Sequence, residues 1–447
     1  MENLMGQYGL RGRCVFLALA FVLFLPPSFA LSSVLDATGL VALGPWVSPS
    51  PVRHHGGDTQ GWLPHSREGS PIPHHGGGAA PWAQVEGPRT GPQDAKARLQ
   101  EVVDAFHAGG TFPGVSAAVS LPGGRVLTAV GGRADTVRHV PMTPEARMLQ
   151  GSVGKTYFAA LAMRLVGDGR LELDAPVSGY LGRHPWYSRV PNAGAITVRH
   201  LMTHASGVMR YEFKEAFAVD LTAHPGKHWR PEELLAYVLD EAPSFAPGEG
   251  WEYSDTNYIL LGMILEEITG RPCYDLIREW LLDPLGLYDT VPSVSRTIPG
   301  LIMGYAGPAN PFGGTDEVLL PDGRFVINPQ FEWAGGGFAS TSADLARWAR
   351  ALYTGEAFDP SLLPAMLEGV PAQLGPGSRY GLGVILTQTS AGPSQGHSGF
   401  FPGYLTEMAY FPELDVAAAV MVNTSVGRSL GRSLKEVLVT LARAAEG

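Results

Sequence analysis

Two residues three positions apart, Ser152 and Lys155, have side chains that together could perform nucleophilic catalysis. They lie at the head of an apolar segment, residues 158–166, whose composition is typical of a buried helix. Residues three apart on a helix share one face, so the hydroxyl and the amine would share one site. A serine becomes a useful nucleophile when a neighbour takes its proton. A lysine can do this if burial or a nearby cation lowers the pKa of its amine.

Lysine is rare in this chain, and Lys155 is the only lysine that follows a serine by three positions. Almost all the other positive charge is carried by arginine, which cannot act as a base. The alternative is that Ser152 only caps a helix, because serine is a favoured N-cap residue. The pair therefore needs support from other parts of the sequence.

Residues 247–257 form a second stretch with more polar and aromatic groups than a loop requires. Tyr253 lies within it, just before a predicted helix over residues 257–269. A tyrosine can take part in proton transfer if a nearby cation lowers the pKa of its phenol from about 10. The stretch is also explained by a buried aromatic beside a helix start that Ser254 or Asp255 caps.

Residues 395–404 form a third stretch, in which His397, Ser398 and Gly399 enter a predicted strand. This order would place polar side chains and an approachable backbone at the edge of a sheet. A backbone N–H there could join that of Ser152 in binding an oxyanion. A polar hairpin turn is the alternative interpretation of this stretch.

The composition excludes several classes of function. The 447-residue chain has a net charge of −10, which argues against a nucleic-acid partner. Its hydrophobic content of 45% supports a large core. Its two cysteines are too few for a disulfide framework.

The first 95 residues differ from the rest of the chain. Residues 1–30 have the pattern of a signal peptide, with two arginines before an apolar run too short to span a bilayer and a cut expected after Ala30. We therefore expect a secreted, periplasmic or cell-envelope exterior protein without stable membrane insertion after cleavage, the alternative being an uncleaved anchor. Residues 31–95, rich in Pro, Gly and His, predict a flexible tether whose paired histidines would bind metal only weakly.

Residues 96–447 have the pattern of a folded domain. A helical spacing covers residues 97–108, and a hairpin is predicted over residues 114–130. Strand patterns return near the end of the chain, at residues 380–386, 404–411 and 416–422. A helix closes the domain at residues 430–445, and helices and loops predominate between about 173 and 321. We therefore expect an α/β (α+β) fold with one sheet built from both ends of the domain and a helical region inserted.

Together the three stretches resemble the serine β-lactamase and penicillin-binding protein superfamily, especially its class C branch of D-alanyl-D-alanine carboxypeptidases, D-aminopeptidases and related esterases. That family carries Ser-x-x-Lys, Tyr-x-Asn and Lys/His-Thr/Ser-Gly in this order. The corresponding residues here are 152–155, 253–255 and 397–399. Residues 200–207 and 335–353 also look like family segments. The resemblance implies an antiparallel sheet covered by helices, a mostly helical subdomain over roughly residues 173–321, and a site between them.

The resemblance also implies a reaction. Ser152 would attack a carbonyl and form an acyl-enzyme, while Lys155 and Tyr253 share the proton transfers. The substrate would be an amide or ester, such as a D-Ala-D-Ala-type peptide, a β-lactam or a small ester, and a cell-wall peptide belongs to this class. The expected partner is thus a small molecule or peptide.

The same resemblance assigns the binding groups around the substrate. The backbone amides of Ser152 and Phe400 would form the oxyanion hole. His397 would replace the lysine often found in the third triplet and, with Ser398, would line the acyl side of the substrate. Gly399 completes this triplet.

One position departs from the family pattern, because the second triplet ends in Asp255 where the family has Asn. An ionised carboxylate only accepts hydrogen bonds, whereas an amide also donates them. If Asp255 faces Lys155, it would favour a charged lysine and make that lysine a poorer base. Proton abstraction would then depend on Tyr253, or Asp255 would orient Lys155. The alternative is a non-catalytic ligand-binding or sensory protein on the same scaffold.

His200 and His204 have the spacing of two zinc ligands on one turn of a helix, which makes a zinc hydrolase a further hypothesis. The residues between them lack the glutamate base of a His-Glu-x-x-His motif. We therefore expect neither a metal nor another cofactor.

Overall fold

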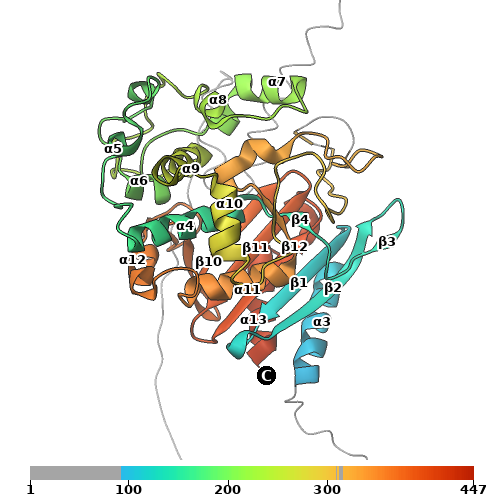
Figure 1. The fold of residues 1–447 in the computed structure, drawn as a ribbon. Helices are drawn as coiled ribbons and strands as arrows, with labels where there is room; N and C mark the ends of the chain where they lie inside the picture. The colour runs from blue at the N-terminus through green and yellow to red at the C-terminus, as the bar shows by residue number, and fades with distance from the viewer. Residues whose placement is uncertain (1–91, 309, 312–315, 447) are drawn as a thin grey trace, which may run out of the picture. The chain divides into compact units, whose positions relative to one another are not determined.

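The computed structural model describes residues 92–308, 310–311 and 316–446 (Figure 1). The predicted signal peptide, residues 1–30, and most of the predicted tether, residues 31–95, lie outside the described residues. The last residues of the tether range instead belong to α3 (Pro92–Ala108), so the first helix begins earlier than its apolar spacing indicates. No helix within the described ranges is long and apolar enough to cross a bilayer.

A nine-stranded antiparallel sheet forms the centre of the fold, in the order β3-β2-β1-β12-β11-β10-β9-β8-β7. Its strands from the start of the domain are β1 (Gly114–Ser120), β2 (Val126–Asp135) and β3 (Val140–Pro141). Its strands from the end are β7 (Val370–Pro371), β8 (Arg379–Tyr380), β9 (Ile385–Thr389), β10 (Gly392–Phe401), β11 (Tyr404–Phe411) and β12 (Val416–Val422). β1 pairs with β12, and Val115 lies opposite Val422. The α/β (α+β) prediction, with one sheet built from both ends of the domain, is confirmed.

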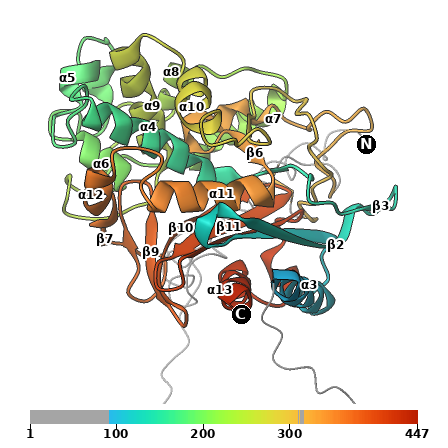
Figure 2. The ribbon, with the colours of Figure 1, turned by 60° about the horizontal axis from the view of Figure 1, so that its bottom comes forward.

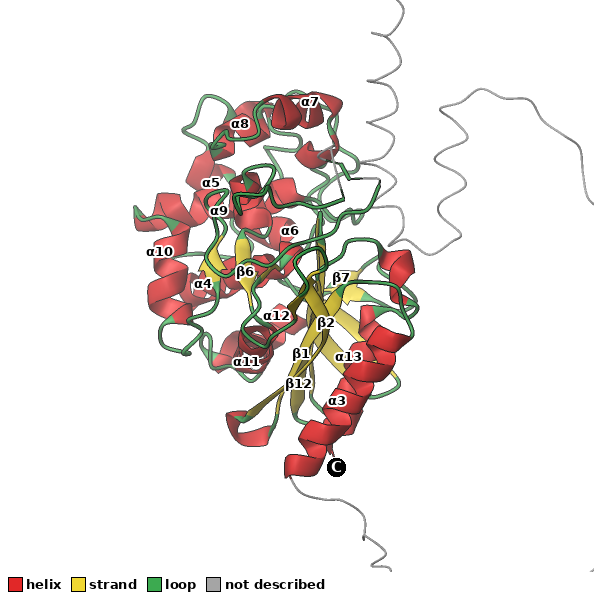
Figure 3. Cartoon of the chain, turned by 90° about the vertical axis from the view of Figure 1, so that its right-hand side faces the viewer, coloured by secondary structure: helices red, strands yellow, loops and turns green. Residues whose placement is uncertain are grey.

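Helices cover both faces of this sheet (Figures 2 and 3). α3 and α13 (Leu434–Glu446) pack on one face, and α11 (Ser342–Tyr353) packs on the other. The central strands β1 and β12 are buried along their whole length. Because both faces are covered, their sequences are continuously apolar or small and do not alternate with polar residues.

Two hydrogen bonds connect the layers on the α11 side. Ser116 of β1 and Ser342 of α11 share a hydrogen bond of 2.8 Å between their hydroxyls. Trp348 of α11 donates its indole N–H to Thr156 Oγ1 over 2.7 Å. Thr156 belongs to α4 (Lys155–Gly167), so the sheet, α11 and α4 form a continuous buried body.

The region from residue 173 to residue 321 consists mainly of helices and the loops that connect them. Its helices are α5 (Ser178–Leu181), α6 (Val198–Met202), α7 (Glu215–Ala223), α8 (Pro231–Leu235), α9 (Asp255–Thr269) and α10 (Cys273–Ile277). α9 is buried over most of its length, which explains its apolar residues on almost every face. A further short helix, α12 (Leu363–Leu367), precedes β7.

A small second sheet, in the order β4-β6-β5, ties two distant loops together. Its strands are β4 (Met148–Leu149), β5 (Val291–Pro292) and β6 (Phe338–Ser340). Leu149 lies opposite Ala339, and the Gln150 N–H donates to the Phe338 carbonyl over 3.1 Å. The residues just after β4 therefore lie beside those just before β6.

The strand predicted for residues 380–386 is divided in the structure into β8 and β9. A turn separates the two strands, in which the Gly381 N–H donates to the Val384 carbonyl over 2.8 Å. Apolar residues continue through this turn because it packs against the core, so the hydropathy pattern does not reveal the break.

Candidate active site

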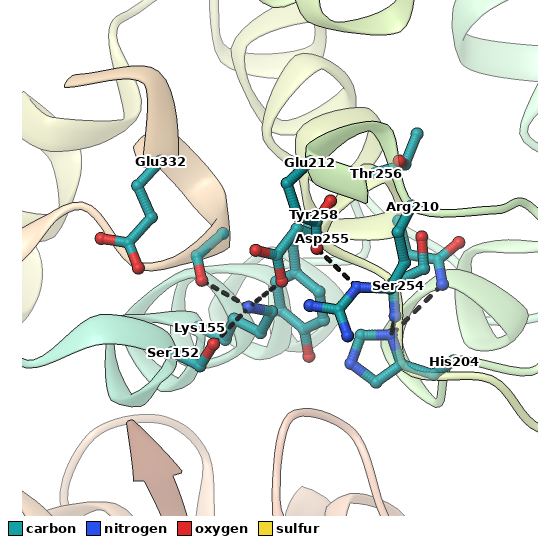
Figure 4. A network of polar contacts seen from close by, with 12 residues as sticks. Ser152, Lys155, His204, Arg210, Glu212, Ser254, Asp255, Thr256, Tyr258 and Glu332 are labelled. Atoms are coloured by element: carbon teal, nitrogen blue, oxygen red, sulfur yellow. Dashed lines mark hydrogen bonds and ion pairs between the residues drawn. The ribbon is translucent and has the colours of Figure 1, made fainter. Parts of the chain in front are cut away.

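Ser152 lies in a 3-10 turn, Gly151–Gly154, that connects β4 to α4. Lys155 is the first residue of α4 and has no exposed surface. Its Nζ lies 2.9 Å from Ser152 Oγ (Figure 4). The spacing of three residues therefore places the hydroxyl and the amine in one site. Ser152 comes from the 3-10 turn, and Lys155 comes from the first position of the helix that follows it.

Lys155 has two further polar partners. Its Nζ lies 2.5 Å from Asp255 Oδ1 and donates to the carbonyl oxygen of Gly335. Burial lowers the pKa of the Lys155 amine, but Asp255 and Tyr253 together outweigh burial and raise that pKa above its ordinary value. Lys155 is therefore a cation at neutral pH in the resting site, and a cation cannot accept the proton of Ser152.

Tyr253 is the other candidate base, and its ring centre lies 4.9 Å from Lys155 Nζ. Burial raises the pKa of its phenol, Lys155 lowers it, Asp255 raises it again, and the net direction is upward. The hydroxyl lies within reach of Ser152 and Lys155, without a well-aligned hydrogen bond to any described residue. It can accept a proton from Ser152 only after losing its own.

The start of α9 positions Tyr253 and Asp255. The backbone N–H of Ser254, the N-cap residue, donates to His204 Nδ1 over 3.2 Å, and Asn257 Nδ2 lies 3.2 Å from the same nitrogen. The His204 ring packs at 4.2 Å from the Tyr253 ring. Asp255 occupies the first turn of α9, where the helix dipole favours a negative charge.

The zinc hypothesis required His200 and His204 to share one turn of a helix. His200 lies in α6, and its Nδ1 accepts the backbone N–H of Thr197 over 3.2 Å at the start of that helix. α6 ends at Met202, and His204 has a left-handed backbone with φ 60°. The two imidazoles are thus not paired along one helical face, and each has a structural hydrogen bond.

His397 lies in β10, with its ring centre 6.3 Å from the ring centre of Tyr253. Its Nδ1 lies 2.7 Å from the Ser398 carbonyl, and its Nε2 lies 2.8 Å from the Tyr380 hydroxyl. Because a carbonyl only accepts, Nδ1 carries the proton and Nε2 accepts from Tyr380. Burial, helped by the charge of Lys155, lowers the pKa of His397 to about 3. This histidine is therefore neutral, and sequence reasoning missed Tyr380 as its partner.

Ser398 follows His397 in the same strand, and its hydroxyl donates to Glu407 Oε1 over 3.2 Å. Neighbouring side chains in a strand point to opposite faces. The structure therefore places the His397 ring on the side of Ser152, and directs the Ser398 hydroxyl to the other face of the sheet. Ser398 can act at the site only through its backbone.

Gly399 and Phe400 bring the backbone of β10 against the 3-10 turn that holds Ser152. A Cβ added to Gly399 would lie 1.9 Å from the Gln150 carbonyl oxygen, and one added to Gly151 would lie 2.4 Å from the Phe400 carbonyl oxygen. β9 pairs with β10 only over residues 392–396, so no described strand continues that pairing beside residues 397–401. Phe400 thus lies beside Ser152, where two backbone amides could bind one oxyanion.

Glu332 is a buried carboxyl near the site that sequence reasoning missed. It is 5% exposed, its Oε2 accepts the Gly337 N–H over 2.9 Å, and burial raises the pKa of its carboxyl to about 8. The loop it stabilises presents the Gly335 carbonyl to Lys155. In this loop Trp333 has φ 36°, a costly backbone conformation of the kind found at functional sites. In the sequence, the position of Glu332 between two aromatic residues could have indicated that this carboxyl is buried.

Arg210 and Glu212 were also missed, and they lie beside Asp255 in Figure 4. Arg210 Nε and Glu212 Oε1 are 2.6 Å apart, and the two side chains are 10% and 12% exposed. Burial raises the pKa of the Glu212 carboxyl to about 7 against the opposing effect of Arg210. Arg210 and Glu212 lie where the sequence shows neither helical nor strand periodicity, so no local pattern predicts that they are buried.

Comparison with known proteins gives matches over most of the described chain. A family model described as Beta-lactamase matches residues 99–440. Penicillin-binding protein 4 from Amycolatopsis lactamdurans is 29% identical over 370 residues, covering 77% of this chain and 90% of that protein. Esterase EstB from Burkholderia gladioli is 29% identical over 326 residues, covering 68% of this chain and 83% of the esterase. The structure of D-amino acid amidase from Ochrobactrum anthropi SV3, complexed with L-phenylalanine amide, matches with a TM-score of 0.67 at 26% identity, covering 78% of this chain and 98% of the amidase.

Proposed function

This chain belongs to the beta-lactamase family of hydrolases, and we propose that it cleaves an amide or ester through an acyl-enzyme on Ser152. The observation that carries the proposal is the 2.9 Å contact between Ser152 Oγ and Lys155 Nζ. The Tyr253 ring lies beside the same amine, and the backbone of Phe400 lies beside the 3-10 turn that holds Ser152. Nucleophile, proton acceptor and oxyanion donors thus lie together in one site.

Tyr253 acts as the base, since Asp255 holds Lys155 in its charged form. In acylation, Ser152 Oγ bonds to the carbonyl carbon while its proton passes to the Tyr253 phenolate and the carbonyl electrons move to oxygen. The tetrahedral intermediate then expels the amine or alkoxide, which takes that proton from Tyr253. In deacylation, water attacks the ester and gives its proton to Tyr253, which returns it to Ser152 as the acyl–oxygen bond breaks.

The amides of Ser152 and Phe400 stabilise the negative oxygen of both intermediates, and the neutral His397 ring borders the acyl side of the substrate. Gly399 allows β10 to approach closely enough for this geometry. The similar proteins include an esterase, a penicillin-binding protein and an amidase. Their names support a β-lactam, a small ester or the amide of a D-amino acid as substrate. The proposal extends this class to a D-Ala-D-Ala-type peptide, with cell-wall peptide as a natural source.

Export is part of the proposal, with residues 1–30 as a signal peptide that is removed, residues 31–95 as a tether and a secreted or cell-envelope location. The basic and apolar order of residues 1–30 supports it. The mass of the protein recovered outside the cytoplasm tests this part, because cleavage after Ala30 leaves a defined shorter chain.

The test of the reaction is labelling and turnover in the full chain. We expect a fluorophosphonate or penicillin adduct on Ser152, and hydrolysis of at least one member of a panel of p-nitrophenyl esters, a chromogenic cephalosporin and D-alanyl peptides. Ser152→Ala should lose both adduct and turnover, whereas Ser361→Ala, at an exposed serine, should retain them. Adduct formation on another residue would contradict the proposal. Binding without turnover of any substrate would favour the non-catalytic role.

A further inference from the structure

Two cations flank the ring of Tyr253, although the family pattern accounts for only one. Lys155 Nζ lies 4.9 Å from the ring centre, and the guanidinium carbon of Arg210 lies 5.4 Å from it. Each cation has its own carboxylate partner. Lys155 pairs with Asp255 at 2.5 Å, and Arg210 pairs with Glu212 at 2.6 Å. Tyr253 therefore lies between two ion pairs.

Arg210 is held firmly in this position. Its side chain is 10% exposed, and the Phe213 ring centre lies 4.0 Å from its guanidinium carbon. Arginine keeps its charge at every pH at which a protein is folded. The guanidinium is thus a fixed positive charge beside the phenol, in surroundings that screen charge less than water does.

Lys155 is the cation that most lowers the pKa of Tyr253, and Arg210 is a second cation that interacts with the same phenol. The ammonium group of Lys155 is shared among Ser152, Asp255 and the Gly335 carbonyl. The carboxylate of Asp255 offsets much of its positive field at Tyr253. Arg210 is offset in the same way by Glu212, because a carboxyl whose pKa burial raises to about 7 is ionised at the higher pH at which Tyr253 loses its proton. The two cations therefore act together on Tyr253, and each is offset in part by its own carboxylate.

We propose that Arg210 is a positioning residue of this active site, whose guanidinium stabilises the ionised form of Tyr253 by adding a second positive charge to that of Lys155, which Asp255 offsets in part. This inference rests on the proposed function, in which Tyr253 is the base. Arg210 touches neither the nucleophile nor the scissile bond in this role. Its effect is on the fraction of enzyme in which Tyr253 can accept a proton.

Apart from Lys155, the other ionisable groups around Tyr253 supply no positive charge. With Lys155 included, these groups come from every element packed on the ring: Lys155 on α4, His204 after α6, Glu212 beside Arg210, Asp255 and Tyr258 on α9, Glu332 before β6, Tyr380 on β8 and His397 on β10. Burial lowers the pKa of both histidines and raises those of Tyr258 and Tyr380, so these four are neutral. The remaining carboxyls oppose the ionisation of Tyr253.

The test is the dependence of kcat/KM on pH for p-nitrophenyl acetate, with the rate of Ser152→Ala subtracted at each pH. In the wild type the rate should rise with pH, because Tyr253 must lose its proton and its pKa is raised. Arg210→Gln should move this rise to higher pH by about one unit, which is about a tenfold loss of rate on its acidic side. Arg210→Lys, which keeps a positive charge there, should move it less.

Glu212→Gln provides a result of opposite sign and decides the question even if Arg210→Gln does not fold. It removes the negative charge next to Arg210, so the rise should move to lower pH. The matched control is Arg189→Gln, which breaks an exposed pair with Asp240 and should leave the profile unchanged. A rise that neither Arg210→Gln nor Glu212→Gln moves in folded enzyme would overturn the role of Arg210. A wild type without Ser152-dependent turnover would instead contradict the proposed function.

Discussion

The two faces of the central sheet are buried by different kinds of side chain. Under α3 and α13, the core consists of apolar residues such as Leu99, Phe106 and Leu438. On the side of α11 and α4, charged groups lie among the apolar ones, with Lys155 fully buried and Glu332 nearly so. The first face is held mainly by apolar packing, with Ser398 and Glu407 as a hydrogen-bonded polar pair, and the second keeps several charges out of water.

This difference separates stability from function. Burying an ion is costly unless it is paired and hydrogen-bonded, and breaking such a pair costs several kcal/mol. The charges near Ser152 are accordingly held in pairs, as with Lys155 and Asp255. Apolar side chains could fill the same space at a lower cost in free energy. The charged arrangement is therefore best explained by chemistry at Ser152, and substitutions on the two faces should differ in what they change.

The largest effect should come from Tyr253→Phe, on the charged side. Loss of the proton acceptor should lower kcat/KM by about 10² to 10⁴-fold. Stability should change little, because the hydroxyl has no well-aligned hydrogen bond to a described residue. Steady-state kinetics and thermal unfolding, measured on one preparation, check both statements. Full activity in this variant would remove Tyr253 from the mechanism.

The apolar face should give the reverse result. Leu438→Ala removes a fully buried side chain of α13 and should lower the free energy of unfolding by about 2 to 5 kcal/mol. The value of kcat/KM per folded molecule should stay at the wild-type level. Val439→Ala, at a partly exposed position of the same helix, is the control and should cost less. Denaturant titration and active-site labelling separate the two quantities. A large fall in kcat/KM for folded Leu438→Ala would break the distinction between the faces.

On the charged side, the smallest effect on kcat/KM should come from Asp255→Asn, although this variant breaks the buried pair with Lys155 and should therefore lower the free energy of unfolding by several kcal/mol. Asp255 raises the pKa of Tyr253 beside the stronger effect of burial, so an uncharged amide should move the rise of kcat/KM to lower pH. A shift of one unit would give about a tenfold gain on the acidic side of the profile. The measurement is the pH profile of kcat/KM and the melting temperature, each compared between the wild type and Asp255→Asn. A uniform loss of rate at all pH values would show instead that Asp255 orients Lys155.

The same contrast explains how far the sequence could predict the structure. The bounds predicted for β11 and β12 agree with the structure, because these strands carry their pattern within their own residues. Ser152 and Lys155 were found for the same reason, as were the triplets of Tyr253 and His397.

The misses concern features that local patterns indicate weakly or not at all. Arg210 and Glu332 are buried by segments distant in the chain, and only the two aromatic neighbours of Glu332 indicate this locally. The direction of the Ser398 hydroxyl depends on which face His397 occupies, and a shift of one residue reverses every side chain of a strand. The break between β8 and β9 was hidden by apolar residues on both sides.

The pairing of β1 with β12 has a consequence for the order of events during biosynthesis. Val115 emerges from the ribosome long before its neighbour Val422 is made. Contacts so distant in sequence form slowly. Phe400 also belongs to the late part, so a nascent chain has the nucleophile long before the amide that would complete the oxyanion hole. We therefore expect hydrolytic competence to arise in one step, after the closing strands have joined the sheet.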